Sequence, residues 1–447
     1  MPQPHVYETN LTRRGPVKPK VLALVPALSI AATLCMPPEA YPQTRAAEVA
    51  NLAERAAIQR AFAAIDEMDA RTSADHMALT VIPAPPFMEE RRARAYAELL
   101  REAGADSVWI DEVGNVIALR RGQTGNRTVA LDAHLDTVFP EGTDVTVRRR
   151  GDTLLAPGIG DDTRGLAMVL AVLRGMNAAE IETEADILFI GTVGEEGLGD
   201  LRGVKQLFSE AGPRIDSWIA VDGGSDARIV HRGLGSHRYR VTFKGPGGHS
   251  WGAFGMANTH HALGRAIHLF VQAADPYTSE GPRTSYNVGR LGGGTSVNSI
   301  PFESWMEVDM RSVSPERLNG VDSLFQRAMR EALAEINAIR RDGEPLTLDV
   351  DMIGDRPSGT MPESTPLVQR ALSATRYFDV EPELSISSTN SNIPISLGIP
   401  AVTIGRGGSG GGGHALNEWW VNDNGTVAIK RALLLLAAEA GVVDLVN

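Results

Sequence analysis

Side chains that bind metal ions follow two of the chain's apolar runs. A run that begins at Thr128 is followed by His134 and Asp136, and a second run is followed by Glu195 and Glu196. Apolar runs of this length and composition indicate strands buried in an α/β sheet. Because such sheets bind ligands at the carboxyl ends of their strands, the pattern predicts an α/β fold with a metal site along that edge.

Three more potential ligands lie at comparable positions. Asp161 precedes an expected helix at 165–176, Asp222 ends the strand-like run 217–221, and His414 follows a glycine-rich segment. Each signal has an ordinary alternative: an Asp caps a helix or forms a turn, and a short His-x-Asp pair is weak by itself. The whole set, in this order and mostly at strand ends, favours a metal site.

The adjacent pair Glu195 and Glu196 needs a turn to act together. Neighbouring side chains on a straight strand point to opposite faces. Gly194 and Gly197 flank the pair and permit the backbone to turn, which would bring both carboxylates to one cavity. A surface turn with two exposed Glu residues is the alternative.

Composition narrows the classes of protein and of ligand. The 447 residues suffice for two ordinary domains with a sizeable core, and the net charge of −12 disfavours nucleic acid or an anionic membrane as the partner. Cys35 is the one cysteine, which excludes an internal disulfide and a thiolate zinc cluster. Any metal must therefore be bound by His, Asp and Glu.

Residues 1–40 have the composition of a leader. Basic residues that include Arg13 and Arg14 precede an apolar run from Val21 to Leu34, which is too short to span a bilayer but typical of a signal peptide. We therefore expect export to the periplasm or the extracellular space. The segment around Arg13 and Arg14 also resembles a twin-arginine signal. A leader that is not a signal would leave the protein in the cytoplasm. A lipoprotein at Cys35 is disfavoured because Leu34 is large.

The pattern of elements changes near Gly235. From there it predicts strand 237–243, helix 257–274, strands 285–291 and 303–311, helix 316–340 and strand 346–352. This βαββαβ order indicates a ferredoxin-like insert, at 235–353, between two parts of one catalytic domain at 41–234 and 354–447. Period-two alternation places Met306 and Met310 on one face of their strand and Arg311 on the other.

The motifs resemble those of one enzyme family. They are HLDTV at His134, GIGDDTRG around Asp161, GTVGEEG around Glu195, AVDGG at Asp222, GGHS at His249 and GGGGHALNE at His414. They resemble the dinuclear zinc exopeptidases, a family that includes peptidase T, glutamate carboxypeptidase, the aminoacylases, and acetylornithine and succinyl-diaminopimelate deacylases. The resemblance implies a catalytic domain with an inserted lid and dimerisation domain, and hence a homodimer.

The resemblance also implies a ligand set. Asp161 would bridge two zinc ions, one completed by His134 and Asp222 and the other by Glu196 and His414. Cobalt or manganese would suit the same oxygen and nitrogen ligands. A mononuclear site is the alternative if Asp161 does not bridge.

Five further residues receive roles from the resemblance. Glu195 would be the general base for a metal-activated water, and Asp136 would orient His134. His249 would stabilise the oxyanion in the partner subunit's site. Asn298 and Arg311 would bind substrate, Arg311 by clamping a terminal carboxylate, although a solvated ion pair is an equal interpretation of Arg311.

Two departures from the family pattern affect the substrate. Thr163-Arg164 replaces a frequent Lys, and Asn390 stands where an Asp is frequent. Asp at position 222 favours the peptidase branches. We therefore expect a dizinc exopeptidase for di- or tripeptides. The alternatives are an N-acyl-amino-acid or carbamoyl amidohydrolase with the same site, and a catalytically inactive binding homologue.

Overall fold

The computed structural model describes residues 40–443 of the chain. Residues 1–39 of the expected leader, including Cys35, lie outside the described residues. Within the described range, no helix is both long enough and apolar enough to cross a bilayer.

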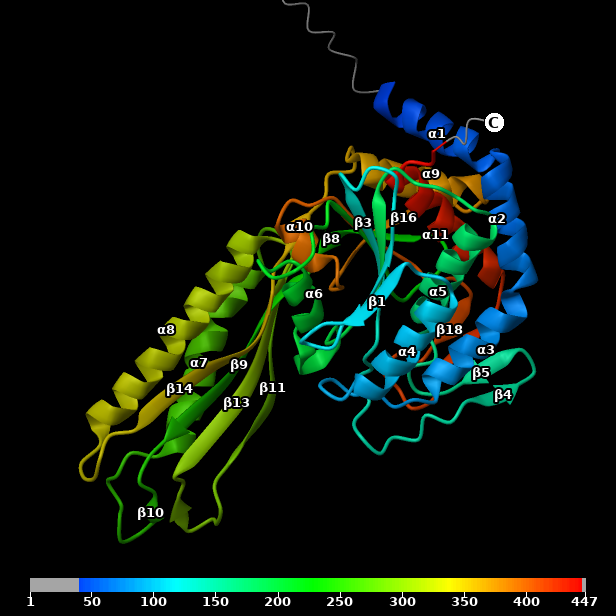
Figure 1. Cartoon of the computed structure of the whole chain (residues 1–447). Coiled ribbons are helices and arrows are strands. Elements are labelled where there is room, and N and C mark those ends of the chain that lie inside the picture. Colours follow the sequence, from blue (N-terminus) through cyan, green and yellow to red (C-terminus); the bar gives the residue numbers. More distant parts are fainter. Residues whose placement is uncertain (1–39, 444–447) are drawn as a thin grey trace, which may run out of the picture. The chain divides into compact units, whose positions relative to one another are not determined.

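A nine-stranded sheet forms the centre of the catalytic domain (Figure 1). Four neighbouring strands in it, β6-β3-β7-β17, run parallel, so their carboxyl ends meet at one edge. The strand order is β1-β2-β6-β3-β7-β17-β8-β15, and β16 also pairs with β8. The bounds are β1 Ser107–Ile110, β2 Val116–Arg120, β3 Thr128–His134, β6 Asp186–Thr192, β7 Ser217–Val221, β8 Arg228–Gly233, β15 Gly359–Thr360, β16 Glu383–Ser387 and β17 Ala401–Ile404.

Helices cover this sheet and complete its hydrophobic core. Helices α5 (Thr163–Ala178) and α11 (Gly425–Ala440) are almost wholly buried against it, and each contacts β3. The other helices are α1 Ala40–Ala53, α2 Ala56–Glu67, α3 Asp69–Thr80, α4 Glu90–Glu102, α6 Arg202–Leu207, α9 Pro366–Tyr377 and α10 Asn392–Ser396. The apolar spacing over residues 48–70 is helical, but the structure divides this stretch at Arg55, which is extended, and at Met68, which leaves helical geometry. Apolar spacing does not reveal such breaks.

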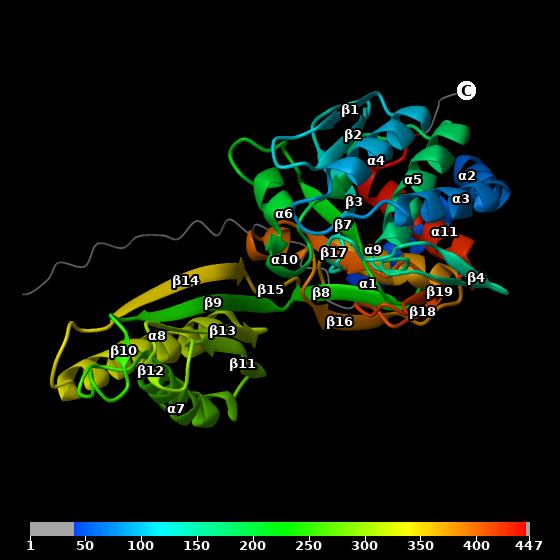
Figure 2. The same cartoon turned by 90° about the horizontal axis from the view of Figure 1, so that it is seen from below.

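Residues 235–356 form a second, smaller unit, here called the insert domain. Its antiparallel sheet has the order β11-β13-β9-β14, and α7 and α8 pack together on one face of it (Figure 1 and Figure 2). The elements are β9 Gly235–Lys244, β10 Gly248–His249, α7 Thr259–Thr278, β11 Thr284–Gly293, β12 Ser299–Ile300, β13 Glu303–Ser312, α8 Pro315–Ile339 and β14 Thr347–Arg356. The main elements follow the predicted ferredoxin-like order.

The insert domain has a hydrophobic core of its own. Phe325 of α8 is fully buried in it and packs against Phe270 and Tyr239. Met306 and Met310 of β13 are buried, and Arg311 lies on the opposite face, as the alternation predicts. Strand β14 continues to Arg356, three residues beyond the predicted boundary at 353.

A small four-stranded sheet holds the glycine-rich segment in place. Its order is β18-β19-β5-β4, with bounds β4 Arg148–Arg150, β5 Thr153–Leu155, β18 Ser409–Gly411 and β19 Trp419–Val421. Part of the glycine run thus forms strand β18 and does not act as a linker. The turn between β18 and β19 carries His414.

Candidate active site

The parallel strands bring the predicted metal ligands to one place. His134 is the last residue of β3, and Asp222 directly follows β7. The loop after β6 carries Glu195 and Glu196, the residues before α5 include Asp161, and His414 approaches from the β18–β19 turn. Sequence positions up to 280 apart therefore meet at the carboxyl edge of the sheet.

Asp161 lies at the centre of the cluster. Its Oδ1 is 3.0 Å from Nε2 of His134, and its Oδ2 is 3.4 Å from Nε2 of His414. His414 Nε2 is also 3.0 Å from Oε1 of Glu196. Two ligand sets share Asp161: one with His134 and Asp222, the other with Glu196 and His414, and the ligand atoms of each set lie within 4.8 Å of one another. These are the two sets that the family resemblance implies, and their imidazole and carboxylate donors suit zinc.

The adjacent residues Asp161 and Asp162 have different tasks. Asp162 caps α5, since its Oδ1 accepts a hydrogen bond from the Gly165 N–H at 3.2 Å. Its Oδ2 accepts from the His134 N–H at 3.3 Å. The helix-cap interpretation therefore holds for Asp162, whereas the carboxylate of Asp161 faces the two histidines.

Glu418 holds the loop that carries Asp161. Its Oε1 accepts hydrogen bonds from the N–H groups of Gly160 and Asp161, both at 2.9 Å, and its Oε2 accepts from Gly158 at 2.7 Å. Sequence reasoning gave Glu418 no role, although the residue belongs to the His414 motif. Its position four residues after a proposed ligand was the available signal.

Asp136 holds the loop that carries the two glutamates. Its carboxylate accepts hydrogen bonds from the N–H groups of Glu195 and Glu196, at 3.0 and 2.8 Å. Gly194 (φ +72°) and Gly197 (φ +52°) permit the expected turn around the pair.

The contact between Asp136 and His134 differs from the expected one. His134 Nδ1 lies 3.0 Å from the main-chain oxygen of Asp136 and 3.8 Å from its carboxylate oxygen. Asp136 therefore orients the imidazole through its carbonyl group, because its carboxylate is engaged by the Glu195–Glu196 loop.

The electrostatics of the cluster favour a bound cation. Burial raises the pKa of Asp222 above its usual value and that of Glu195 well above its usual value. Burial would also raise the pKa of Asp161, but hydrogen bonds with His134 and His414 bring it below its usual value. Hydrogen bonds to Asp161 and Glu196 raise the pKa of His414 to about 10. Such a concentration of buried negative charge requires compensation, which divalent cations supply.

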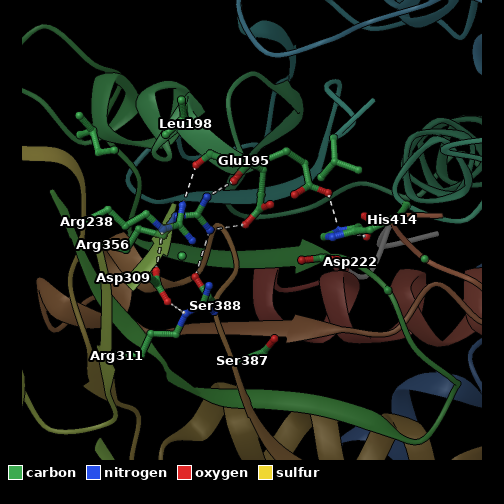
Figure 3. A pocket seen from close by; sticks show the side chains of 18 of the residues that line it. Glu195, Leu198, Asp222, Arg238, Asp309, Arg311, Arg356, Ser387, Ser388 and His414 are labelled. Atoms are coloured by element: carbon green, nitrogen blue, oxygen red, sulfur yellow. Dashed lines mark hydrogen bonds and ion pairs between the residues drawn. The ribbon is translucent and has the colours of Figure 1, made fainter. Parts of the chain in front are cut away.

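A pocket of about 750 Å³ opens beside these ligands. Asp161, Glu195, Glu196, Asp222 and His414 line it on the side of the central sheet. In Figure 3, Glu195 lies between His414 and a group of arginines. The arginines that line the pocket are Arg228, Arg238, Arg290, Arg311, Arg356 and Arg406.

Arg311 lines this pocket from the insert domain. Its Nε donates a hydrogen bond to Oδ2 of Asp309 at 2.7 Å, and Arg238 Nε donates to Oδ1 of the same carboxylate at 2.9 Å (Figure 3). Arg238 also donates to the main-chain oxygen of Gly197, at 2.8 Å. The single carboxylate of Asp309 thus pairs with the guanidinium groups of both Arg311 and Arg238, which leaves a net positive charge on this wall of the pocket. Sequence reasoning missed Arg238, which has no distinctive local pattern.

His249 and Asn298 lie away from this pocket. His249 is in β10, and the main-chain oxygen of Asn298 accepts a hydrogen bond from the Ser250 N–H at 2.9 Å. Both side chains are exposed, and neither lines the pocket of its own chain. The expectation that His249 acts in a partner's site, and that Asn298 binds substrate, stays a prediction.

Known proteins resemble the chain in sequence and in fold. A putative LysW-lysine/LysW-ornithine hydrolase of Pyrococcus abyssi is 24% identical over 344 residues, which cover 74% of this chain and 83% of the relative. The uncharacterised protein YqjE of Bacillus subtilis is 24% identical over 303 residues, covering 66% and 76%. The crystal structure of aminopeptidase PepT from Bacillus cereus superposes with a TM-score of 0.66 at 20% identity, covering 83% of this chain and 98% of that one.

The family model described as peptidase family M20/M25/M40 matches residues 130–438, which include every predicted metal ligand. The match includes the whole insert domain and extends into both parts of the catalytic domain. The chain therefore belongs to peptidase family M20/M25/M40 and is a hydrolase that acts on peptide or amide bonds.

Proposed function

We propose that the protein is a dizinc exopeptidase that hydrolyses the amide bond of di- and tripeptides. The observation that carries the proposal is the pair of ligand sets that share Asp161, with the carboxylate of Glu195 beside them. The chemistry that two zinc ions supply at such a site is activation of a water molecule and polarisation of the scissile carbonyl.

Glu195 is the general base in this proposal. It takes the proton of the attacking water and passes it to the nitrogen of the leaving amine, which keeps the proton count balanced. Its main chain is held by Asp136, and its side chain is 7% exposed, so bulk water does not compete for the proton. These contacts give the base a defined position before substrate arrives.

Arg311 binds the free carboxylate of the substrate in this proposal. Its guanidinium lines the pocket and has only part of its hydrogen-bonding capacity engaged by Asp309. A substrate with its scissile carbonyl at the proposed metal ligands would direct a terminal carboxylate toward the arginine side of the pocket. The name of the PepT neighbour, an aminopeptidase, supports a peptide substrate.

An N-acyl-amino-acid amidohydrolase is the second candidate. Among the described residues, the acidic lining groups outside the proposed metal and base residues are Glu307 and Asp309. Glu307 pairs with Arg240 and Arg290, as Asp309 does with Arg238. A free α-ammonium group on the substrate would therefore meet paired carboxylates, which favours a blocked amine. The Pyrococcus abyssi relative is named as a putative LysW-lysine/LysW-ornithine hydrolase, which supports a substrate other than a di- or tripeptide.

Export and dimerisation are further parts of the proposal. The composition of residues 1–40 supports export, and the family resemblance supports a homodimer formed through the insert domain. N-terminal sequencing of protein from the culture fluid or periplasm tests the first, and light scattering of the purified protein tests the second. An intact leader on cytoplasmic protein, or a monomeric mass, would contradict them.

The test is hydrolysis of a panel of di- and tripeptides with free or blocked ends, together with N-acetyl amino acids. We expect turnover by the zinc-loaded enzyme, its loss in Glu195→Ala with both metals still bound, and its loss when the substrate carboxylate is amidated. Turnover of N-acetyl amino acids in preference to peptides would select the second candidate. No turnover of any panel member with two metals bound would support the inactive binding homologue.

A further inference from the structure

Arg356 makes direct contact with the proposed base. It is the last residue of β14, where the chain leaves the insert domain, and it is 4% exposed. Its Nη1 lies 3.2 Å from Oε1 of Glu195, and its Nη2 donates a hydrogen bond to the main-chain oxygen of the same residue. Nη1 also donates to Oγ of Ser388 at 3.0 Å (Figure 3). The guanidinium thus holds Glu195 at two points and is itself oriented by Ser388.

Glu195 has a competing position available. Besides the two ligand sets that share Asp161, a third group of potential ligand atoms within 4.8 Å of one another joins Glu195 with His134 and Glu196. A carboxylate is an ordinary zinc ligand. If the Glu195 carboxylate bound a metal ion, its lone pairs would be engaged and it could not accept the proton of the attacking water. Something must therefore keep this carboxylate out of the coordination sphere.

We propose that Arg356 is the positioning residue that keeps the Glu195 carboxylate off the metal ions and so preserves it as the base. This inference rests on the proposed function. Among the described residues, Arg356 is the cation with a hydrogen bond to this carboxylate; the neighbouring Arg238 is engaged by Asp309 and Gly197. Because both partners are buried, their attraction is little screened by solvent.

Arg356 connects the proposed base to the end of the insert domain that joins the catalytic domain. In the sheet register Arg356 pairs with Ser236 of β9, so the strands that enter and leave the insert domain are joined beside Glu195. A guanidinium at this point is carried by a sheet and not by a free loop. Glu195 is therefore held on one side by Arg356, which a sheet carries, and on the other by Asp136, which accepts a hydrogen bond from the Glu195 N–H.

The experiment compares three variants with the wild-type enzyme. Arg356→Gln removes the charge, Arg356→Lys keeps a charge, and Ser388→Ala removes only the hydroxyl that orients the guanidinium. Arg370→Gln is the matched control, because Arg370 also pairs with a buried glutamate, Glu439, but outside the pocket. Each protein is loaded with cobalt, whose visible spectrum reports the number and geometry of its ligands, and kcat and KM are measured on the zinc form.

We expect Arg356→Gln to bind two metal ions and to show a changed cobalt spectrum, typical of an added ligand. Its kcat should fall about 100-fold, the lower part of the usual contribution of a positioned base, with KM changed by less than about threefold. The double variant with Glu195→Gln should show the spectrum of Glu195→Gln alone, because the intruding carboxylate is gone. Arg356→Lys should keep the wild-type spectrum and part of kcat, and Ser388→Ala should change both in the same direction as Arg356→Gln but less.

Two outcomes would overturn this inference without affecting the proposed function. The first is a wild-type kcat and a wild-type spectrum in Arg356→Gln. The second is a fall in kcat with no spectral change, in Arg356→Gln or in Ser388→Ala. If Arg356→Gln does not fold, the spectrum of Ser388→Ala decides. The proposed function fails separately, and on the wild-type background, if the protein binds fewer than two metal ions or if Glu195→Ala keeps its activity.

Discussion

His76 makes the stability of the fold depend on pH. It lies in α3, fully buried, with its Nε2 2.5 Å from the main-chain oxygen of Ile159 and its ring edge-on to Trp420. Its Nδ1 has no hydrogen-bond partner among the described residues. Burial, reinforced by the positive charge of Arg164, lowers the pKa of His76 to about 3. The folded protein therefore holds this imidazole neutral.

The sign of the effect follows from proton binding. In the unfolded chain His76 has a pKa of about 6.5. Below that pH the unfolded state therefore binds a proton that the folded state does not bind. The free energy of unfolding therefore falls as the pH falls from about 6.5 toward 3. Between pH 7 and pH 5 the two pKa values give a loss of about 2 kcal/mol from His76 alone. That is a large fraction of the ~5–15 kcal/mol that stabilises a typical domain.

The assay is urea unfolding of the zinc-loaded protein at both pH values, beside His76→Gln. Glutamine keeps an N–H for Ile159 but does not titrate, so other pH effects, including metal release, are common to both proteins. We expect the wild type to lose about 2 kcal/mol more than the variant between pH 7 and pH 5. Equal losses in the two proteins would refute the reasoning, whatever their absolute stabilities.

Two predictions concern residues that support the site. Glu418→Gln leaves at least one of the three N–H groups around Asp161 without its acceptor. We therefore expect the affinity for zinc, measured by competition with a chelator, to fall about 10- to 100-fold. An unchanged affinity would contradict the role assigned to Glu418. Asn390 donates hydrogen bonds to Asp132 Oδ2 at 2.6 Å and to Thr192 Oγ1 at 2.7 Å. Asn390→Leu removes this donor from a buried carboxylate and should cost about 1–3 kcal/mol in urea unfolding; a wild-type midpoint would show that the contact contributes nothing.

Local pattern was sufficient for the parallel strands β3, β6 and β7, for the order of elements in the insert domain, and for the expectation that the candidate ligands lie along one edge of the sheet. The apolar runs before His134, Glu195 and Asp222 are readable because a buried parallel strand is apolar throughout and its end is marked by polar residues. The βαββαβ order of the insert domain follows from the same local periods. Parallel strands align their carboxyl ends, so residues that end such strands were predicted to meet without knowledge of the packing.

Tertiary structure alone decided which atoms of these residues meet. Local pattern could not distinguish the carboxylate of Asp161, which faces two histidines, from that of Asp162, which caps a helix, because adjacent identical residues carry the same local signal. The family resemblance was what assigned the bridging role to Asp161. It identified Asp136 but not the atom through which Asp136 orients the imidazole.

Local sequence pattern also could not reveal the contacts that support the site, because their partners are far apart in the chain. Arg356 and Glu195 are 161 residues apart, and Glu418 and Asp161 are 257 apart. A single Arg at a strand end, or a single Glu after a turn, has the same appearance in a sequence whether it faces solvent or a buried partner. Only the packing of the insert domain and of the small sheet against the catalytic domain brings such pairs together, and it excludes the water that would otherwise weaken them.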